Sequence, residues 1–159
     1  MKFDLKDYEL ILASNSARRI DFFKQMHIPF KIKKLKVDES YPKKLKGIEI
    51  VKYILKNKAK AVKNQLKRNQ IIIVADTIVL CDGKPLGKPK DKESGFKMIQ
   101  TLSGKTHSVV TAVGFLFKKK FHRIISSTRV TFKVLEKEEI RFYIEKYDPI
   151  DKAGGYGIQ

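Results

Sequence analysis

The sequence predicts a single α/β domain over residues 1–159. Two segments indicate this fold class. Residues 71–80 form the most apolar run of the chain, and a run without polar alternation is typical of a strand covered on both faces. Residues 48–66 instead repeat apolar side chains at the spacing of an amphipathic helix. The length allows one sizeable core, and a second independent domain is not expected.

The first predicted strand, residues 8–13, runs into a small polar turn at residues 14–16. A helix is expected from the last serine of that turn, a good N-cap, to the break at Pro29. Arg18 and Arg19 in its first turn oppose the helix dipole, at a cost of about 0.3–1 kcal/mol each. A bound anion would reverse that sign, so the segment predicts a phosphate cradle, with two ordinary surface arginines as the alternative.

Residues 30–37 predict a half-exposed strand, because apolar residues and lysines alternate there imperfectly. The strand is expected to end at the acidic pair Asp38 and Glu39. Such a pair is either a solvated turn or the source of a carboxylate for a divalent metal, and the pattern leaves both interpretations open.

Lys58 departs from the pattern of the predicted 48–66 helix. The other lysines lie opposite its apolar face, whereas Lys58 lies within that face, one turn from both Ile54 and Val62. Its side chain either extends along its stem to solvent or points its ammonium into a site that contains anions. The carboxylate of Asp76 and the arginines of the first helix favour the second interpretation.

Asp76 lies at the centre of the predicted 71–80 strand, and Thr77 follows it. An ionised carboxylate in a buried strand is costly unless cations or hydrogen-bond donors meet it. The alternative is that the strand ends at Ala75 and that Asp76 caps a turn.

Lys88 is a further candidate cation, because Gly87 and Pro89 restrict the backbone on either side of it and can hold its ammonium in place. The remaining elements are expected in this order: a helix capped by Asp91, strands over 109–117 and 121–134, a helix over 140–147, and a glycine-rich functional loop over 150–159.

The composition restricts the classes of site and location. One cysteine, Cys81, excludes an internal disulfide and a cysteine-rich zinc site, and the three histidines lack the spacing of metal ligands. Since neither a membrane-spanning apolar run nor a secretory signal is present, a cytoplasmic protein without a membrane partner is expected.

The formal net charge of +18 raises the alternative of nucleic-acid binding. The lysines are spread along the chain, however, and no aromatic-rich single-strand motif accompanies them. A solvated basic surface is therefore favoured, and a nucleic-acid partner is not expected. The same positive field would attract a small polyphosphate anion.

Five short motifs occur in order along nearly the whole chain. They are Leu10-Ile11-Leu12-Ala13-Ser14-Asn15-Ser16-Ala17-Arg18-Arg19, Ala75-Asp76-Thr77, Gly87-Lys88-Pro89, Leu102-Ser103-Gly104-Lys105-Thr106-His107 and Asp151-Lys152-Ala153-Gly154-Gly155-Tyr156-Gly157-Ile158-Gln159. Together they resemble the Maf family of nucleoside triphosphate pyrophosphatases. The resemblance implies hydrolysis of a nucleoside triphosphate to the monophosphate and pyrophosphate, assisted by a divalent cation, Mg²⁺ or Mn²⁺. It also implies an elongated mixed β-sheet with flanking helices, in two lobes with a central cleft.

The resemblance implies roles for individual residues. Asp76 corresponds to the proton acceptor for the water that attacks the α-phosphorus, and Glu39 corresponds to the acidic residue that joins it near the metal. The positions that bind phosphates are occupied by Ser14, Arg18, Arg19, Lys58 and Lys88.

Within the family, Arg18, Thr77 and Gln159 resemble the branch that acts on dTTP and UTP, and a modified pyrimidine nucleotide is a further candidate substrate. A glutamine amide can pair with the donor and acceptor of a uracil or thymine edge. The alternatives are a 7-methyl-GTP pyrophosphatase and a nucleic-acid-binding or septum-forming cell-division regulator without catalysis.

The chain departs from the family pattern in two places. Ala17 replaces the proline that usually starts the helix. Family members also continue beyond the position of Gln159, so a chain that lacks a C-terminal strand and helix is expected. Absent sheet partners would leave an exposed sheet edge and could affect stability and the expected homodimer. A catalytically inactive remnant is therefore a third alternative.

Overall fold

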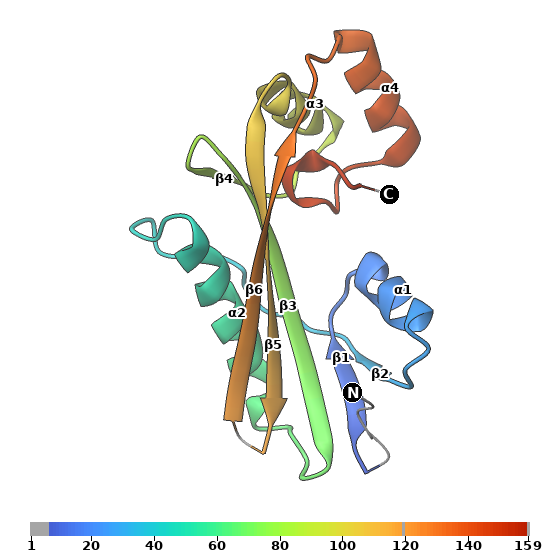
Figure 1. The fold of residues 1–159 in the computed structure, drawn as a ribbon, viewed down its shortest axis with the longest axis vertical. Coiled ribbons are helices and arrows are strands. Elements are labelled where there is room, and N and C mark those ends of the chain that lie inside the picture. The colour runs from blue at the N-terminus through green and yellow to red at the C-terminus, as the bar shows by residue number, and fades with distance from the viewer. Residues whose placement is uncertain (1–6, 119, 159) are drawn as a thin grey trace. The chain divides into compact units, whose positions relative to one another are not determined.

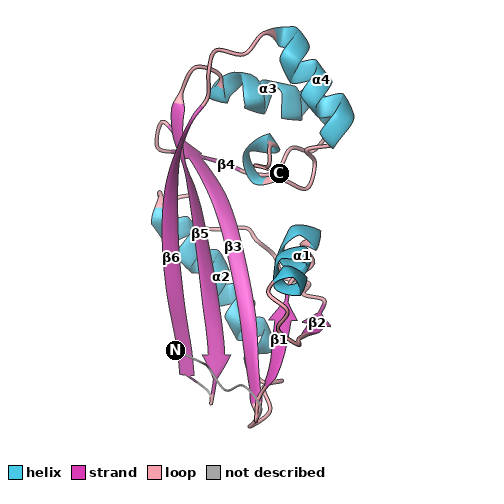
Figure 2. Ribbon diagram, turned by 45° about the vertical axis from the view of Figure 1, so that its right-hand side comes forward, coloured by secondary structure: helices cyan, strands magenta, loops and turns pink. Residues whose placement is uncertain are grey.

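The structure is a computed structural model that describes residues 7–118 and 120–158. The strands of this part are β1 (Glu9–Ala13), β2 (Lys31–Lys33), β3 (Gln70–Cys81), β4 (Lys84–Leu86), β5 (Thr106–Phe117) and β6 (Lys120–Thr131). Its helices are α1 (Ala17–Gln25), α2 (Ile48–Lys63), α3 (Lys92–Leu102) and α4 (Lys137–Tyr147), with one 3₁₀ turn, η1 (Ala153–Gly155). Figure 2 shows how these helices and strands follow one another.

The strands form one mixed sheet (Figure 1). Its order is β2-β1-β3-β5-β6, and β4 pairs with β3 beside this path. β1 runs parallel to β2 and β3, whereas β4 runs antiparallel to β3. The register places Leu12 of β1 opposite both Ile32 of β2 and Ile73 of β3. The mixed α/β fold predicted from the sequence is therefore confirmed.

The chain divides into two compact units. The first consists of Met1–Pro42, Lys52–Asp76 and Ala112–Ile125, and the second of Lys43–Val51, Thr77–Thr111 and Ser126–Gln159. β3 passes from the first unit to the second between Asp76 and Thr77. These two neighbouring candidate residues therefore belong to different units, and the single domain over 1–159 stays a prediction.

In the first unit, α1 packs on one face of the sheet. Leu10, Leu12 and Ile73 are buried together, and Ile20 and Phe23 of α1 pack against them. Because β1 and β3 are parallel and in register, the three strand residues share a face. The two helix residues are three positions apart and so lie on one side of α1. Ile20 and Phe23 therefore form the apolar side by which α1 packs on the sheet.

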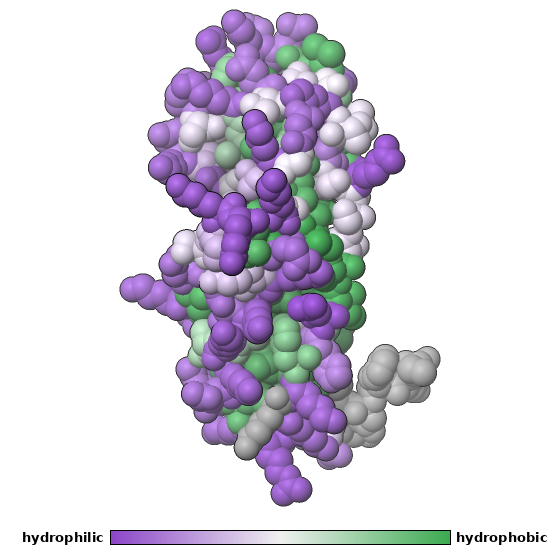
Figure 3. All heavy atoms as spheres, turned by 90° about the vertical axis from the view of Figure 1, so that its left-hand side faces the viewer, coloured by the Kyte–Doolittle hydropathy of each residue, from purple (hydrophilic) through white to green (hydrophobic). Residues whose placement is uncertain are grey.

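α2 has a buried apolar face with one charged member. Ile54, Leu55 and Val62 are buried there, and Lys58 is only 7% exposed. Lysines on the other side of the helix, such as Lys60, are exposed. Figure 3 faces the side on which α2 lies in Figure 1, and hydrophilic side chains cover much of that surface. The helical spacing predicted from the sequence is therefore confirmed.

The second unit has its own core. Val79, Cys81 and Leu102 are buried together, and Phe132 and Tyr156 pack against them. α3 contacts both α4 and η1. The glycine-rich segment near the end of the chain is therefore packed onto a hydrophobic core, although it has little regular structure.

Several predicted boundaries are wrong. α1 ends at Gln25 rather than at the break before Pro29, because His27 adopts a left-handed backbone with φ of 53° that a helix cannot include. Four other boundaries differ by three residues each: α2 ends at 63 rather than 66, β5 begins at 106 rather than 109, β6 ends at 131 rather than 134, and α4 begins at 137 rather than 140. α4 begins early because Glu136 and Glu139 form a capping box ahead of the apolar residues.

Two short strands also differ from the prediction. β2 covers only Lys31–Lys33 instead of 30–37, because the backbone of Leu35 bonds the side chain of Asn15 rather than a neighbouring strand. β4 was not predicted, because three residues that include Pro85 give no strand signal.

Candidate functional site

Asp76 lies in β3 with its side chain 10% exposed. The ammonium nitrogen of Lys58 lies 2.5 Å from its Oδ1 atom and 3.3 Å from the carbonyl oxygen of Ala75. β3 continues through Asp76 to Cys81, so the alternative in which the strand ends at Ala75 and Asp76 caps a turn is wrong. A buried cation from α2 meets the carboxylate, as its burial requires.

A second carboxylate reaches the same ammonium. Nζ of Lys58 lies 2.7 Å from Oε1 of Glu39, whose side chain is 44% exposed. The neighbouring Asp38 instead accepts hydrogen bonds from the amide nitrogen and the hydroxyl of Ser40, at 2.9 and 2.6 Å. Asp38 therefore stabilises a turn and Glu39 joins a buried ammonium, and a metal-binding role of Glu39 stays a prediction.

Asn15 fixes the segment that leads to Glu39. Its Nδ2 donates to the carbonyl oxygen of Leu35 at 2.7 Å, and its Oδ1 accepts from the amide nitrogen of Leu35 at 3.0 Å. These bonds attach the 14–16 turn to the chain that leaves β2. In the sequence, Asn15 is recognisable only as a small polar residue of a turn. Its side-chain amide carries a donor and an acceptor, so it can bond both the carbonyl and the amide nitrogen of a backbone segment.

The N-terminal end of α1 adjoins the strand that carries Asp76. Nη1 of Arg19 donates to the carbonyl oxygen of Ala75 at 2.9 Å, and Arg18 precedes it in the first turn. Ser14 is buried, and its Oγ accepts from the amide nitrogen of Ser16 at 3.2 Å. Ser16 occupies the N-cap position, but its side chain makes no capping hydrogen bond, so the predicted cap is wrong in this respect.

Burial controls the proton affinity of this group. It raises the pKa of Asp76 above the ordinary value of an aspartate, and Lys58 opposes that rise most strongly. The charge of Glu39 adds to the rise, while the charge of Arg19 opposes it. Burial also lowers the pKa of Arg19, although the two carboxylates act against this effect. A carboxylate with a raised pKa binds a proton more readily, which suits a general base.

The two carboxylates fit one kind of metal site. The described ranges contain no group of three or more His, Cys, Asp or Glu side chains that could hold a metal ion. Mg²⁺, however, often takes one or two carboxylates and completes its shell with water and substrate phosphates. Glu39 and Asp76 match that donor set, because both direct an oxygen at the same Nζ atom.

Three further candidates belong to the second unit or fall outside the described residues. Successive residues of a strand face opposite sides, so Thr77 points away from the face of β3 that carries Asp76. Its hydroxyl hydrogen-bonds the hydroxyl of Thr111 in β5 at 3.0 Å, a partner that the sequence analysis missed. Lys88 is exposed in the second unit, after β4. Gln159 lies outside the described residues. Within the first unit, the structure brings together Arg19, Glu39, Lys58 and Asp76.

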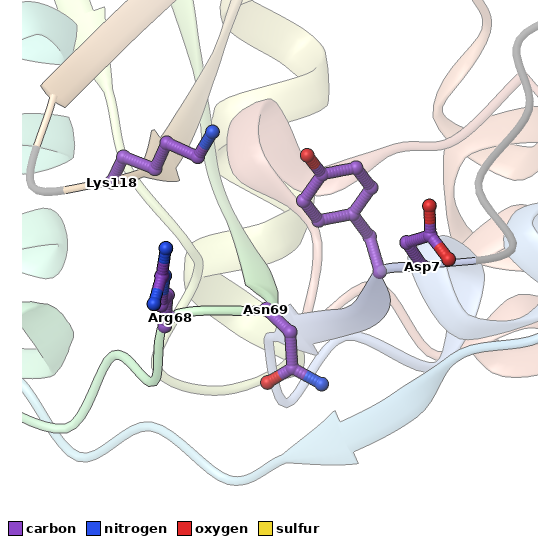
Figure 4. A pocket seen from close by; sticks show the side chains of 5 residues that line it. Asp7, Arg68, Asn69 and Lys118 are labelled. Atoms are coloured by element: carbon purple, nitrogen blue, oxygen red, sulfur yellow. The ribbon is translucent and has the colours of Figure 1, made fainter.

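A hollow of about 360 Å³ opens elsewhere in the first unit (Figure 4). It is lined by Asp7, Tyr8, Arg68, Asn69 and Lys118. In Figure 4, Arg68 and Lys118 lie on one side of it and Asp7 on the other. None of the candidate residues lines this hollow, so it adds nothing to the group around Asp76.

The solved structure of the Staphylococcus aureus Ham1 protein has a similar fold. It matches with a TM-score of 0.55 at 15% sequence identity, over 76% of this chain and 70% of that one. At this identity the likeness shows the fold alone.

Curated relatives match the chain far more closely in sequence. A dTTP/UTP pyrophosphatase from Flavobacterium johnsoniae is 46% identical over 159 residues, which are 100% of this chain and 82% of that protein. A dTTP/UTP pyrophosphatase from Christiangramia forsetii is 47% identical over 156 residues, 98% of this chain and 79% of that protein. The model of the family described as Maf-like protein matches residues 9–159. These matches cover each of the five motifs, and they show that the chain belongs to the Maf family.

Proposed function

We propose that the protein hydrolyses dTTP and UTP to the nucleoside monophosphate and pyrophosphate. The observation that carries the proposal is the Lys58 ammonium held between the carboxylates of Asp76 and Glu39. Two relatives named dTTP/UTP pyrophosphatase, matched over nearly the whole chain, support the substrate class. Modified pyrimidine nucleotides are further candidate substrates for the same site.

Asp76 is the proposed general base. A water molecule attacks the α-phosphorus, its proton passes to the carboxylate, and pyrophosphate leaves with the electrons of the broken P–O bond. Burial raises the pKa of Asp76, so the carboxylate accepts a proton more readily than an exposed aspartate would. The cations beside it favour the ionised form that the reaction requires.

Positive side chains are the proposed ligands of the triphosphate, because fixed cations stabilise the charge that spreads over the phosphates. The three N–H donors of Lys58 already face Asp76, Glu39 and the carbonyl of Ala75. A phosphate oxygen would therefore replace one of these acceptors. The proposed phosphate ligands are Ser14, Arg18, Arg19, Lys58 and Lys88.

Glu39 and Asp76 are the proposed protein ligands of a divalent cation, Mg²⁺ or Mn²⁺. When bound, such an ion would neutralise charge on the phosphates. Oxygen ligands suit both ions. In this chain the Lys58 ammonium holds the two carboxylates close together, so both would be in place to bind a metal ion.

Selection of the base is proposed to involve Arg18, Thr77 and Gln159. A glutamine amide has the donor and acceptor that a uracil or thymine edge requires. The hydrogen bond between Thr77 and Thr111 would fix the hydroxyl of Thr77 in one orientation. A 7-methyl-GTP pyrophosphatase is the alternative, and the relatives named dTTP/UTP pyrophosphatase favour the pyrimidine assignment.

The nucleotide is the proposed partner, and a homodimer and a cytoplasmic location stay predictions. No helix within residues 7–118 and 120–158 is long and apolar enough to cross a membrane. Light scattering coupled to size-exclusion chromatography measures the oligomeric state directly.

Product analysis tests the proposed function. The protein is incubated with Mg²⁺ and, separately, dTTP, UTP, CTP and 7-methyl-GTP, and pyrophosphate and orthophosphate are quantified. We expect pyrophosphate, most of it from dTTP and UTP. Asp76→Asn should lower the rate by about 100- to 10,000-fold, the usual contribution of a general base.

Asp82→Asn is the matched control. Asp82 is also an aspartate paired with a lysine, Lys105, at 2.8 Å, but its side chain is 66% exposed. We expect a rate within about twofold of the wild type, since an exposed ion pair contributes little. Release of orthophosphate instead of pyrophosphate, or an active Asp76→Asn variant, would sink the proposal.

A further inference from the structure

We infer that His107, Tyr143 and Tyr156 are positioning residues that fix the backbone of residues 154–157 and, through it, the backbone beside Lys88. The inference rests on the proposed function, because it assigns a role in binding the triphosphate. These three residues are called the aromatic anchor below. None of them was assigned a role by the sequence analysis.

His107 and Tyr156 form the centre of the aromatic anchor. His107 is the second residue of β5, is 3% exposed, and has its Nε2 atom 2.6 Å from the hydroxyl of Tyr156. The two rings meet edge to face, with centroids 5.4 Å apart. Phe132 contacts both rings in the same manner, at 5.0 Å from His107 and 4.8 Å from Tyr156. A hydrogen bond inside such a cluster fixes the ring of Tyr156 as well as its hydroxyl.

Both groups are neutral near pH 7. Burial lowers the pKa of His107 below the ordinary value of a histidine. Burial and the nearby Tyr143 raise the pKa of Tyr156 to about 12. The contact is therefore a hydrogen bond between two uncharged groups, in which one ring tautomer accepts from the phenol and the other donates to it. A neutral, buried pair has no catalytic charge to offer, which indicates a positioning role.

Two backbone hydrogen bonds fix the residues on either side of Tyr156. The amide nitrogen of Gly157 donates to the hydroxyl of Tyr143 in α4 at 2.9 Å. The amide nitrogen of Gly154 donates to the carbonyl oxygen of Gly87 at 2.8 Å. Gly154, Tyr156 and Gly157 are thus tied to the segment after β4, to β5 and to α4.

Gly154 shows how tightly this segment is packed. Its φ is +75°, and a Cβ atom placed there would lie 2.7 Å from a methyl carbon of Val79. Any other residue type would be strained at this φ and would force Val79 or the segment itself to move. The backbone of the segment is therefore held against the core of the second unit rather than lying loosely over it.

The bond between Gly154 and Gly87 connects the aromatic anchor to Lys88, the next residue along the chain. Without the hydrogen bonds of the aromatic anchor, the backbone on either side of Lys88 would be less ordered in the free protein. It would then have to become ordered when the triphosphate binds, and that ordering would reduce the free energy of binding. The expected result is weaker binding of the triphosphate, with little change in the chemical step.

Tyr156→Phe tests the inference, because it keeps the ring and removes only the hydroxyl. We expect KM for UTP to rise about fivefold while kcat stays within about twofold, as for the loss of one hydrogen bond that acts on binding. His107→Leu should have the same effect, and His107→Gln, which keeps a side-chain amide for the phenol, should restore part of the loss. Circular dichroism and thermal melting verify that each variant is folded.

Tyr147→Phe is the matched control, since it removes a phenol hydroxyl from the exposed side of α4. We expect wild-type KM and kcat. An unchanged KM in Tyr156→Phe, or equal losses in Tyr147→Phe, overturns the aromatic anchor but leaves the pyrophosphatase intact. Absence of pyrophosphate release by the wild-type protein overturns the proposed function first and the anchor with it.

Discussion

Lys58 differs from the other lysines within residues 7–118 and 120–158 because its ammonium is buried and faces two carboxylates. A buried cation is costly unless its donors find acceptors, and those of Lys58 find Asp76, Glu39 and a backbone carbonyl. Lys58 and Glu39 both act on the pKa of Asp76, Lys58 by lowering it and Glu39 by raising it. The proton affinity of Asp76 is therefore open to adjustment by single substitutions.

Glu39→Gln should shift the acid limb of the pH profile. The proposed base must be ionised, so kcat/KM falls as the pH drops through the pKa of Asp76 in the free enzyme. The negative charge of Glu39 contributes to raising that pKa, and its removal lowers the pKa. The midpoint of the acid limb should therefore move to lower pH, and the plateau should fall because a proposed metal ligand is lost. The measurement is kcat/KM for UTP from about pH 4 to 8.

Glu138→Gln, an exposed carboxylate in the first turn of α4, provides the control for the loss of one negative charge. It should leave the midpoint unchanged. A Glu39→Gln midpoint equal to or above that of the wild type would contradict the coupling of the two carboxylates.

At the scale of elements, two loops place Glu39, whereas Asp76 lies within β3. Asn15 joins the turn before α1 to the segment after β2, and that segment leads to Glu39. Asn15→Ala removes both hydrogen bonds to Leu35. We expect the Mg²⁺ concentration for half-maximal activity to rise about fivefold, since each partly exposed bond contributes modestly, with near-wild-type kcat at saturating metal. A metal titration of the steady-state rate measures this effect.

Asn64→Ala removes an exposed asparagine side chain just beyond α2 and serves as the control. Its metal dependence should match that of the wild type. If Asn15→Ala also matches the wild type, the segment that carries Glu39 does not need this attachment.

Local patterns were sufficient to predict the elements that carry the main site. Helical spacing over 48–66 identified Lys58 as the one lysine on a buried face, and the apolar run over 71–80 identified Asp76 as a buried carboxylate. Both inferences depend on residues within one helix or one strand. Nucleotide specificity could not be predicted from the spacing of residues within one helix or strand. Its assignment to Arg18, Thr77 and Gln159 rested on the resemblance to a family.

The attachments between distant segments could not be predicted. Asn15 and Leu35, or His107 and Tyr156, lie 20 and 49 positions apart, and only the folded chain shows that they meet. Strand alternation gives the side of β3 on which Thr77 lies. The sequence left open whether the strand continues past Asp76, so that side could be assigned only once the structure showed that it does. Residues that position others have no chemical signature of their own, whereas a buried charge does.

For the molecule as a whole, the largest unexplained quantity is its net charge of +18. The lysines that carry it are distributed over both units, and those on the outer side of α2, such as Lys56, Lys60 and Lys63, are exposed. Such a field concentrates any polyanion near the surface. The same charge therefore agrees with a triphosphate substrate and with the nucleic-acid-binding alternative, and salt dependence separates the two.

Raising KCl from about 20 to 300 mM should lower kcat/KM for UTP by about three- to tenfold, because added salt shortens the range over which the basic surface attracts a triphosphate. kcat should change little, since bound substrate no longer depends on long-range attraction.

A nucleic-acid-binding protein would instead bind a DNA oligonucleotide with a steep salt dependence that survives Asp76→Asn. Fluorescence anisotropy with labelled DNA, at the same salt concentrations, measures this second behaviour. We expect binding to DNA to be lost at a salt concentration at which UTP is still hydrolysed, and tight DNA binding by Asp76→Asn in 150 mM KCl would favour the nucleic-acid alternative.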